Sequence, residues 1–156
     1  MKSISAFLEN IIKILLIVIV AVLVSSTALQ VVSRFILKSP IIWTEEVTRM
    51  SFIWMSLLGA ALATKYKEHL GLDLLTDKLT GAIKKALQIA IHTGMIGVVI
   101  ILIVAGWIFV EKNLGRTSVT TGMPMYYLYI SAPISGLFML FYLIEQIPSL
   151  LKDGDK

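Results

Sequence analysis

The chain has 156 residues, of which 57% are hydrophobic and 15% charged, with a formal net charge of +4 and no cysteine. Soluble domains are about 45–50% apolar and about 25% charged, so this composition excludes a water-soluble domain and indicates an integral membrane protein. The lack of cysteine also excludes disulfides, thiolate metal sites and iron–sulfur clusters.

Four apolar segments are long enough to cross the hydrocarbon layer, which takes roughly 20 residues of helix. They run over residues 14–32, 43–64, 86–110 and 126–144. We therefore predict an all-α integral membrane protein, with one domain over residues 1–156 and four transmembrane helices. The connections between the segments are too short to form a second domain.

The first segment has a cleavable signal peptide as an alternative, because Lys2 precedes it and residues 26–28 loosely resemble a cleavage site. The apolar run continues to Val32, which favours a span. Between Ile4 and Ile12, apolar residues recur at i, i+3 and i+4. This spacing predicts an amphipathic helix that lies on the membrane surface before the first span.

The second segment begins with a charged cluster that contains Trp43, Glu45, Glu46 and Arg49. Glu45 lies 19 residues before Thr64, about 28 Å along a helix, which places both carboxylates at the membrane interface. Arg49 can pair with either carboxylate, at i+4 or i+3. Two interpretations stay open: a capped helix with an interfacial ion pair and an anchoring tryptophan, or a polar contact with another membrane subunit.

Small residues follow in the second segment, where Ser56/Ala60 and Gly59/Ala63 form small-xxx-small pairs that let helix backbones approach closely. Further small residues lie on the third and fourth segments: Thr93, Gly97, Ser131, Ala132, Ser135 and Gly136. Packing inside the chain's own bundle explains any one of them. Their presence on three spans nonetheless predicts a face for a partner subunit.

The connection after the second span predicts a second surface-lying helix, over about residues 72–87, because apolar residues recur on one face. Glu68, His69 and Asp73 stand just before it, but strong ligands are too few there for a metal site. His92 is the one histidine inside a span, and packing explains it. The sequence contains no nucleotide-binding loop or catalytic triad, so we predict neither an enzyme nor a bound cofactor or metal.

The distribution of basic residues predicts the orientation. With four spans both termini share one side, which carries nine of the Lys and Arg residues against five on the other side. Basic residues are enriched in cytoplasmic connections, so we expect both termini in the cytoplasm. The positive charge then reflects topology and attraction to anionic lipid, and it does not indicate nucleic-acid binding.

The residues between 34 and 73 resemble the signature of the small, Q-type (DctQ-like) membrane subunit of tripartite ATP-independent periplasmic (TRAP) transporters. The resemblance rests on these elements in this order and spacing: Arg34-Phe35, Trp43-Thr44-Glu45-Glu46, Arg49, Trp54, Leu58-Gly59-Ala60-Ala61, Glu68-His69 and Asp73. The chain length and the four predicted spans fit the same family.

The resemblance implies a subunit of the bacterial or archaeal cytoplasmic (inner) membrane, with a large TRAP permease subunit, a periplasmic substrate-binding protein and membrane lipid as partners. In this family the large subunit carries the substrate and sodium sites and moves like an elevator, while the small subunit supports its static scaffold. The implied function is sodium-coupled, binding-protein-dependent uptake of an organic anion of the carboxylate or sialic acid type, with no substrate site in this chain.

Candidate residues for a subunit interface or interfacial anchor are Arg34, Trp43, Glu45, Glu46, Arg49, Trp54, Gly59, Ala60, Ala63, His69 and Asp73. Lys112 and Arg116, in the last outward connection, are candidates for contact with the binding protein. Two other functions stay open. A self-sufficient four-span carrier needs an embedded carboxylate, which the first span lacks. A non-transport membrane assembly factor fits the composition, and only the signature disfavours it.

Overall fold

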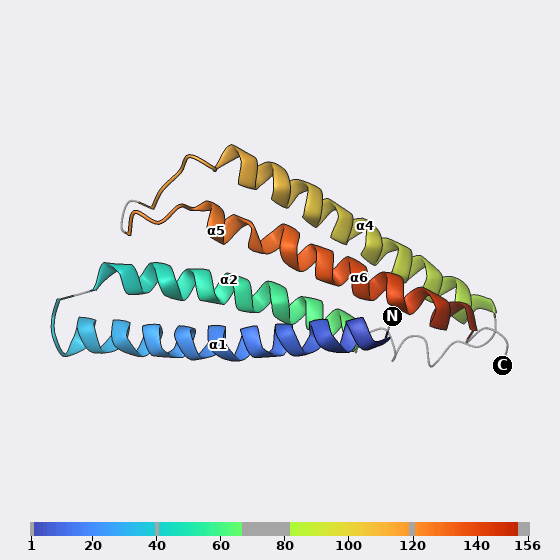
Figure 1. Ribbon diagram of the computed structural model, residues 1–156, viewed down its shortest axis with the longest axis horizontal. Coiled ribbons are helices and arrows are strands. Elements are labelled where there is room, and N and C mark those ends of the chain that lie inside the picture. The colour runs from blue at the N-terminus through green and yellow to red at the C-terminus, as the bar shows by residue number, and fades with distance from the viewer. Residues whose placement is uncertain (1, 40, 67–81, 119–120, 153–156) are drawn as a thin grey trace.

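The computed structural model describes residues 2–39, 41–66, 82–118 and 121–152 (Figure 1). The helices are α1 (Lys2–Phe35), α2 (Ile42–Lys65), α4 (Ala82–Lys112), α5 (Tyr126–Tyr129) and α6 (Ser131–Lys152), and these described ranges contain no strand. Four segments are long and apolar enough to cross a membrane: α1, α2, α4 and the pair α5–α6. The prediction of an all-α fold with four spans is confirmed.

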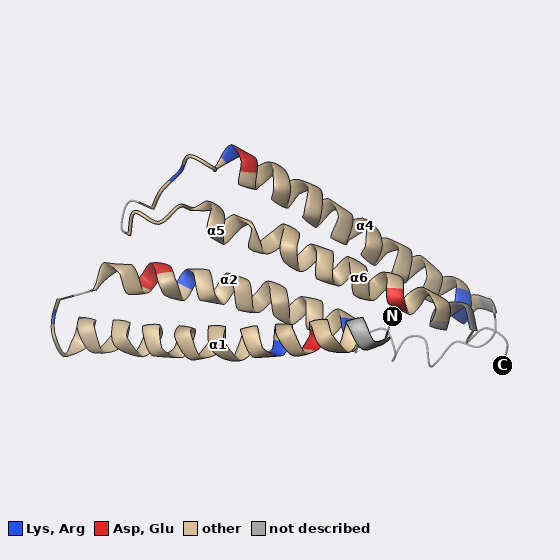
Figure 2. Cartoon of the chain, in the orientation of Figure 1, with Lys and Arg blue, Asp and Glu red and all other residues tan. Residues whose placement is uncertain are grey.

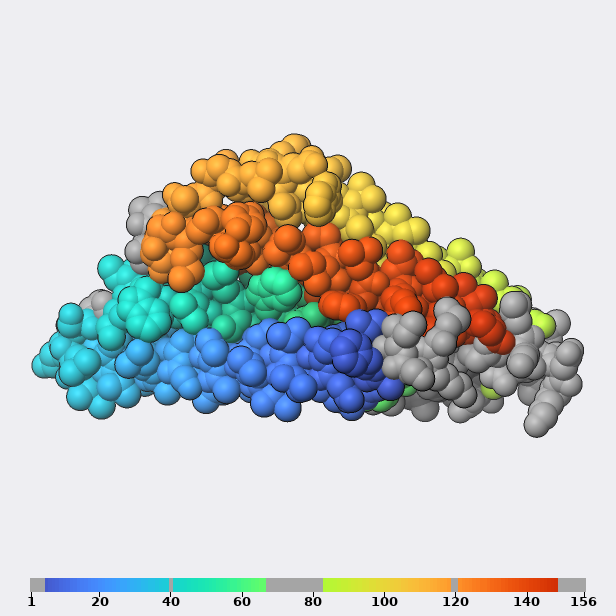
Figure 3. Space-filling view, viewed as in Figure 1, coloured from blue at the N-terminus to red at the C-terminus, as the bar shows by residue number. Residues whose placement is uncertain are grey.

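The four long helices form a row in the order α1, α2, α6, α4 (Figure 1). α1 and α2 form one antiparallel pair and α4 and α6 another, and α2 packs against α6. In the space-filling view, α1 and α4 lie on opposite edges (Figure 3). The two pairs meet where α1 begins and α2 ends, which we call the terminal end, and they separate toward the opposite, loop end (Figure 1).

The interior of the protein contains small hydroxyl side chains as well as apolar ones, and many large apolar side chains face outward. Ser33, Thr44, Ser131 and Ser135 are almost fully buried, while Ile17 is 70% exposed. Ser26 and Thr48 share a hydrogen bond of 2.9 Å between α1 and α2. This distribution suits lipid, because small residues let helices approach and apolar side chains are solvated by acyl chains.

Two apolar clusters near the terminal end place α2 and α6 at the centre of the row. The first joins α1, α2 and α6 and is built on Ile12, Leu58 and Tyr142. The second joins α2, α4 and α6 and is built on Ala61, Val99, Met139 and Leu143. Residues from all four long helices thus contribute to the core, and the outer helices α1 and α4 each join one of its two clusters.

Two glycines allow α4 and α6 to approach closely. A Cβ atom built on Gly106 would lie 2.9 Å from Cδ of Pro133, and one built on Gly136 would lie 2.6 Å from Cγ1 of Ile103. Both distances are shorter than side chains normally tolerate, so each glycine accommodates the neighbouring helix. Pro133 itself stands in the first turn of α6, where a helix has no need of its missing N–H.

The structure corrects the prediction of a separate surface-lying helix before the first span. α1 runs without interruption from Lys2 to Phe35, so residues 4–12 continue the spanning helix. No Gly or Pro interrupts this stretch, and Ile12 is fully buried in the cluster with Leu58 and Tyr142. Of the second predicted surface helix, residues 72–81 lie outside the described residues, and residues 82–87 belong to α4.

Candidate functional site

The two adjacent carboxylates at the start of α2 have different partners. Glu45 forms an exposed ion pair with Arg49, with 3.3 Å between Oε1 and Nη2. Glu46 is partly buried and accepts hydrogen bonds from Ser118 Oγ at 2.6 Å and Thr121 Oγ1 at 2.7 Å. Neighbouring helix positions point about 100° apart, so one carboxylate faces outward and the other faces the α4–α5 connection.

A tryptophan adds a second contact across the loop end, where the helix pairs separate. The indole Nε1 of Trp54 donates a hydrogen bond to the backbone carbonyl of Tyr127 at 3.1 Å. This bond joins α2 to α5, and the Glu46 hydrogen bonds join α2 to the α4–α5 connection. Trp54 and Glu46, singled out as interface candidates, therefore hold together two parts of this chain.

The other candidates at the loop end are exposed. Trp43 is 47% exposed and lines a groove between α1 and α2 together with Leu29 and Val47. Arg34 lies in the last turn of α1, where a positive charge is favourable for the helix dipole. These positions suit anchoring at the membrane interface.

The described residues leave three small residues of α2 at least partly uncovered. At Gly59 a Cβ atom would meet no other atom within 4 Å, and Ala60 is exposed. Ala63 is partly exposed, whereas Ala61 is fully buried against α4 and α6. We call Gly59, Ala60 and Ala63 the small face of α2. The remaining two interface candidates, His69 and Asp73, lie outside the described residues.

Lys112 and Arg116 are exposed at the loop end, at and just after the end of α4. Hydrogen bonds join the two described sides of the turn that follows, from Ser118 N to Met123 O at 2.8 Å and from Met125 N to Arg116 O at 2.9 Å. Gly122 adopts φ of +68° in this turn, a conformation that favours glycine. Both basic side chains are thus exposed, and the Arg116 backbone is held by a hydrogen bond.

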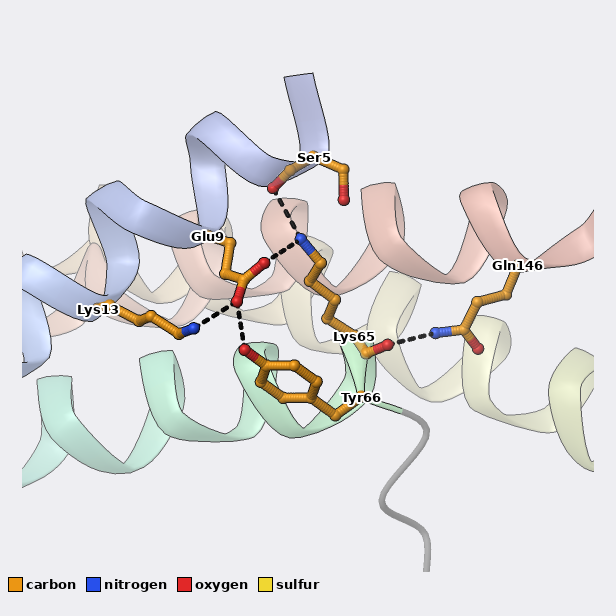
Figure 4. Close-up of polar contacts among 6 residues, drawn as sticks. All are labelled: Ser5, Glu9, Lys13, Lys65, Tyr66 and Gln146. Atoms are coloured by element: carbon orange, nitrogen blue, oxygen red, sulfur yellow. Dashed lines mark hydrogen bonds and ion pairs between the residues drawn. The ribbon is translucent and has the colours of Figure 1, made fainter. Parts of the chain in front are cut away.

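The terminal end contains a polar cluster that the sequence analysis missed (Figure 4). Its centre is Glu9, which pairs with Lys65 at 2.7 Å and with Lys13 at 2.5 Å and accepts a hydrogen bond from the Tyr66 hydroxyl. Lys65 also donates to the backbone carbonyl of Ser5 at 2.9 Å. We call Ser5, Glu9, Lys13, Lys65 and Tyr66 the Glu9 cluster, and it joins the start of α1 to the end of α2.

One local signal could have indicated part of this cluster. Glu9 and Lys13 stand at i and i+4, a spacing that favours an ion pair on one helix face. The contact with Lys65 carries no such signal, because 56 residues separate it from Glu9. Gln146 on α6 completes the arrangement by donating to the Thr64 carbonyl at 2.6 Å, which satisfies a carbonyl in the last turn of α2.

Charged residues lie toward the two ends of the helices, and the middle of each span contains none (Figure 2). His92, inside the third span, shares a hydrogen bond with the Leu143 carbonyl at 3.1 Å. Within the described ranges, no three His, Asp or Glu side chains are grouped so that they could hold a metal ion. These features define a small polytopic membrane protein with charged residues toward its two ends and large apolar side chains on its outer faces.

The profile of the DctQ component of tripartite ATP-independent periplasmic transporters matches residues 23–153, and the chain belongs to this family. It is therefore a small permease subunit of a transporter in the inner membrane and not an enzyme. Small subunits of this family work with a large permease. The resemblance of residues 34–73 to the small TRAP subunit is thus confirmed as family membership.

Several relatives support this assignment. The chain is 28% identical to the sialic acid TRAP transporter small permease protein SiaQ of Vibrio cholerae, over 97% of this chain and 88% of that protein. It is 30% identical to a candidate TRAP transporter small permease protein of Haemophilus influenzae, over 97% and 94% of the two chains. Other relatives are named as C4-dicarboxylate and ectoine TRAP transporter small permease proteins.

One relative is much longer than this chain. The sialic acid TRAP transporter permease protein SiaT of Haemophilus influenzae is 24% identical over 125 residues, which are 80% of this chain but 20% of that protein. In SiaT, a region similar to this chain is thus part of a longer polypeptide.

Proposed function

We propose that this chain supports the static scaffold of a large TRAP permease during sodium-coupled uptake of an organic anion delivered by a periplasmic binding protein. The observation that carries the proposal is the absence of charged side chains from the middle of all four spans. Coupled carriers place ionisable groups within the membrane. The coupling and substrate sites therefore belong to the partner, and this chain has a mechanical role.

The shape of the protein supports a mechanical role. An elevator moves one domain across the bilayer while another stays fixed, and a fixed part with a broad footprint resists tilting. Four helices in a row spread over more membrane than a closed bundle of the same helices (Figures 1 and 3). The row also presents large apolar side chains on its surface, which suits contact with lipid and with a membrane partner.

We propose that the small face of α2 contacts the large permease. Close approach of two helices requires small residues that are not already covered, and Gly59 and Ala60 meet this condition. The charged residues at the start of α2, with Arg34 and Trp43, act as anchors at the membrane interface. The terminal end, which carries more of the basic residues, faces the cytoplasm.

Replacement of Gly59 by leucine tests this interface. A Cβ atom at Gly59 would meet no described atom within 4 Å, so we expect Gly59→Leu to keep the fold and to separate the two backbones at the proposed contact. We expect less of the large permease to co-purify with the tagged variant, and less uptake by cells. Ala28→Leu, at an exposed position of α1, is the matched control. Co-purification and uptake at the control's level in Gly59→Leu cells would contradict the interface.

We propose that Lys112 and Arg116 contact the binding protein through complementary charge, because both are exposed at the loop end. Reversing both charges should raise the concentration of binding protein that half-saturates uptake in vesicles, with little change in the maximal rate. Lys38→Asp is a control at the same end, since Asp tolerates the positive φ of this position. An unchanged concentration dependence would exclude the contact.

The transported molecule is proposed by class only, as an organic anion of the carboxylate or sialic acid type. The relative named for sialic acid is 28% identical and the one named for C4-dicarboxylate is 24% identical. This difference is too small to assign a substrate, and we propose that the partners determine it. Uptake assays with labelled candidates in cells that contain the complete system would identify it.

A further inference from the structure

A cavity of about 300 Å³ lies at the terminal end between α1, α2 and α6, and its lining includes Ser5, Lys65, Tyr142, Glu145 and Gln146. It adjoins the Glu9 cluster, because Ser5 and Lys65 belong to both. Figure 4 shows these two residues within the cluster. Its position at the ends of the spans is the level at which lipid head groups meet a membrane protein.

The cavity contains a hydroxyl group that lacks a partner. Tyr142 is 1% exposed, and its hydroxyl makes no hydrogen bond within the described part of the chain. Buried polar groups in proteins are nearly always hydrogen-bonded, so such a hydroxyl indicates a partner that the chain does not supply. The Tyr142 ring also lies against Lys65, whose Nζ is 5.3 Å from the ring centroid.

Lys65 and Glu145, which carry opposite charges, line the same cavity, and each can make a further hydrogen bond or ion pair. Lys65, with 18% of its side chain exposed, uses two of its three N–H donors, on the Ser5 carbonyl and on Glu9. Glu9 also pairs with Lys13, so its single negative charge is shared between two lysines and does not fully neutralise Lys65. Glu145 is partly buried and makes no hydrogen bond or ion pair with a described residue.

A ligand that satisfies these groups has an anionic oxygen and a separate ammonium group. We propose that the cavity binds the head group of a phospholipid with a phosphate and a primary ammonium, as in phosphatidylethanolamine. The phosphate accepts hydrogen bonds from Lys65 and from the Tyr142 hydroxyl, and the ammonium donates to the carboxylate of Glu145. The acyl chains extend along the apolar surfaces of the helices.

Lipid retention measured by native mass spectrometry tests this proposal. The full-length chain, with any permease that co-purifies, is incubated in detergent with lipids that share dioleoyl chains and differ in head group. Phosphatidylethanolamine should be retained about tenfold more than phosphatidylcholine, whose ammonium has no N–H, or phosphatidylglycerol, which has no ammonium. Equal retention of the three lipids would overturn the proposal.

Two variants separate the contacts. Glu145→Gln should reduce retention of phosphatidylethanolamine to the level of phosphatidylcholine, whereas Tyr142→Phe, which keeps the ring, should reduce retention of all three phospholipids. Glu111→Gln, at the exposed loop end, is the control and should retain the preference. An unchanged preference in Glu145→Gln would overturn the ammonium contact. Binding of soluble phosphoethanolamine without retention of any lipid would overturn the lipid assignment.

Discussion

Replacement of Gly106 by alanine tests the close contact between α4 and α6. The added methyl group would lie 2.9 Å from Cδ of Pro133, 3.2 Å from Cβ of Ala132 and 3.3 Å from the Pro133 backbone nitrogen. A proline ring and a backbone atom cannot rotate away as a flexible side chain can. The helices must therefore separate, and they lose contact along the interface.

The expected size follows from two opposing effects. Overpacking of a well-packed contact costs about 1–3 kcal/mol. Replacing glycine by alanine inside a helix stabilises it by about 0.8–1.0 kcal/mol. Gly106→Ala should therefore lower the free energy of unfolding by about 0–2 kcal/mol.

Gly97, also on α4, provides the matched control because a methyl group there would meet no atom within 4 Å. Gly97→Ala keeps the helix gain and should raise stability by about 1 kcal/mol, which separates the two variants by about 1–3 kcal/mol. Unfolding in mixed micelles, followed by tryptophan fluorescence, measures the difference. If Gly106→Ala were as stable as Gly97→Ala, the contact inferred between α4 and Pro133 would be wrong.

Three further predictions concern the polar contacts. Glu46→Gln should weaken the hydrogen bonds that hold the α4–α5 connection and speed its proteolysis in detergent. Glu45→Gln removes only an exposed ion pair worth about 0.2–1 kcal/mol, so this variant should be cleaved at the rate of the parent protein. Trp54→Phe should lower the free energy of unfolding by about 0.5–1.5 kcal/mol, because the Tyr127 carbonyl loses its donor, and an unchanged unfolding curve would argue against that bond. Lys65→Met should loosen the start of α1, seen as faster amide exchange before residue 13, and unchanged exchange would contradict its role as a link between α1 and α2.

Local features of the sequence predicted the spans and the family. Hydropathy identifies a span because the hydrocarbon layer requires about 20 apolar residues in succession, a condition met or failed within one segment. The signature between Arg34 and Asp73 is also local, since it lies within two segments and their connections. The spacing of Glu45 and Arg49 predicted their ion pair in the same way, from one helical turn.

The same reasoning failed where a local pattern had two meanings. The apolar spacing of residues 4–12 fits a helix on the membrane surface and equally fits a spanning helix that packs on neighbours with one side. Burial of Ile12 against α2 and α6 decides for the second. The different partners of Glu45 and Glu46 were equally hidden, because they depend on where the α4–α5 connection lies.

The sequence by itself determined that the chain is a four-span membrane protein of the DctQ type, with charged residues only toward the ends of its spans. Tertiary structure decided the order α1, α2, α6, α4, the Glu9 cluster and the open small face of α2. The physical reason is that each of these helices carries apolar side chains on most of its own faces. Hydropathy therefore does not indicate which face packs against which neighbouring helix. Contacts such as Lys65 with Glu9 arise only when specific helices pack together.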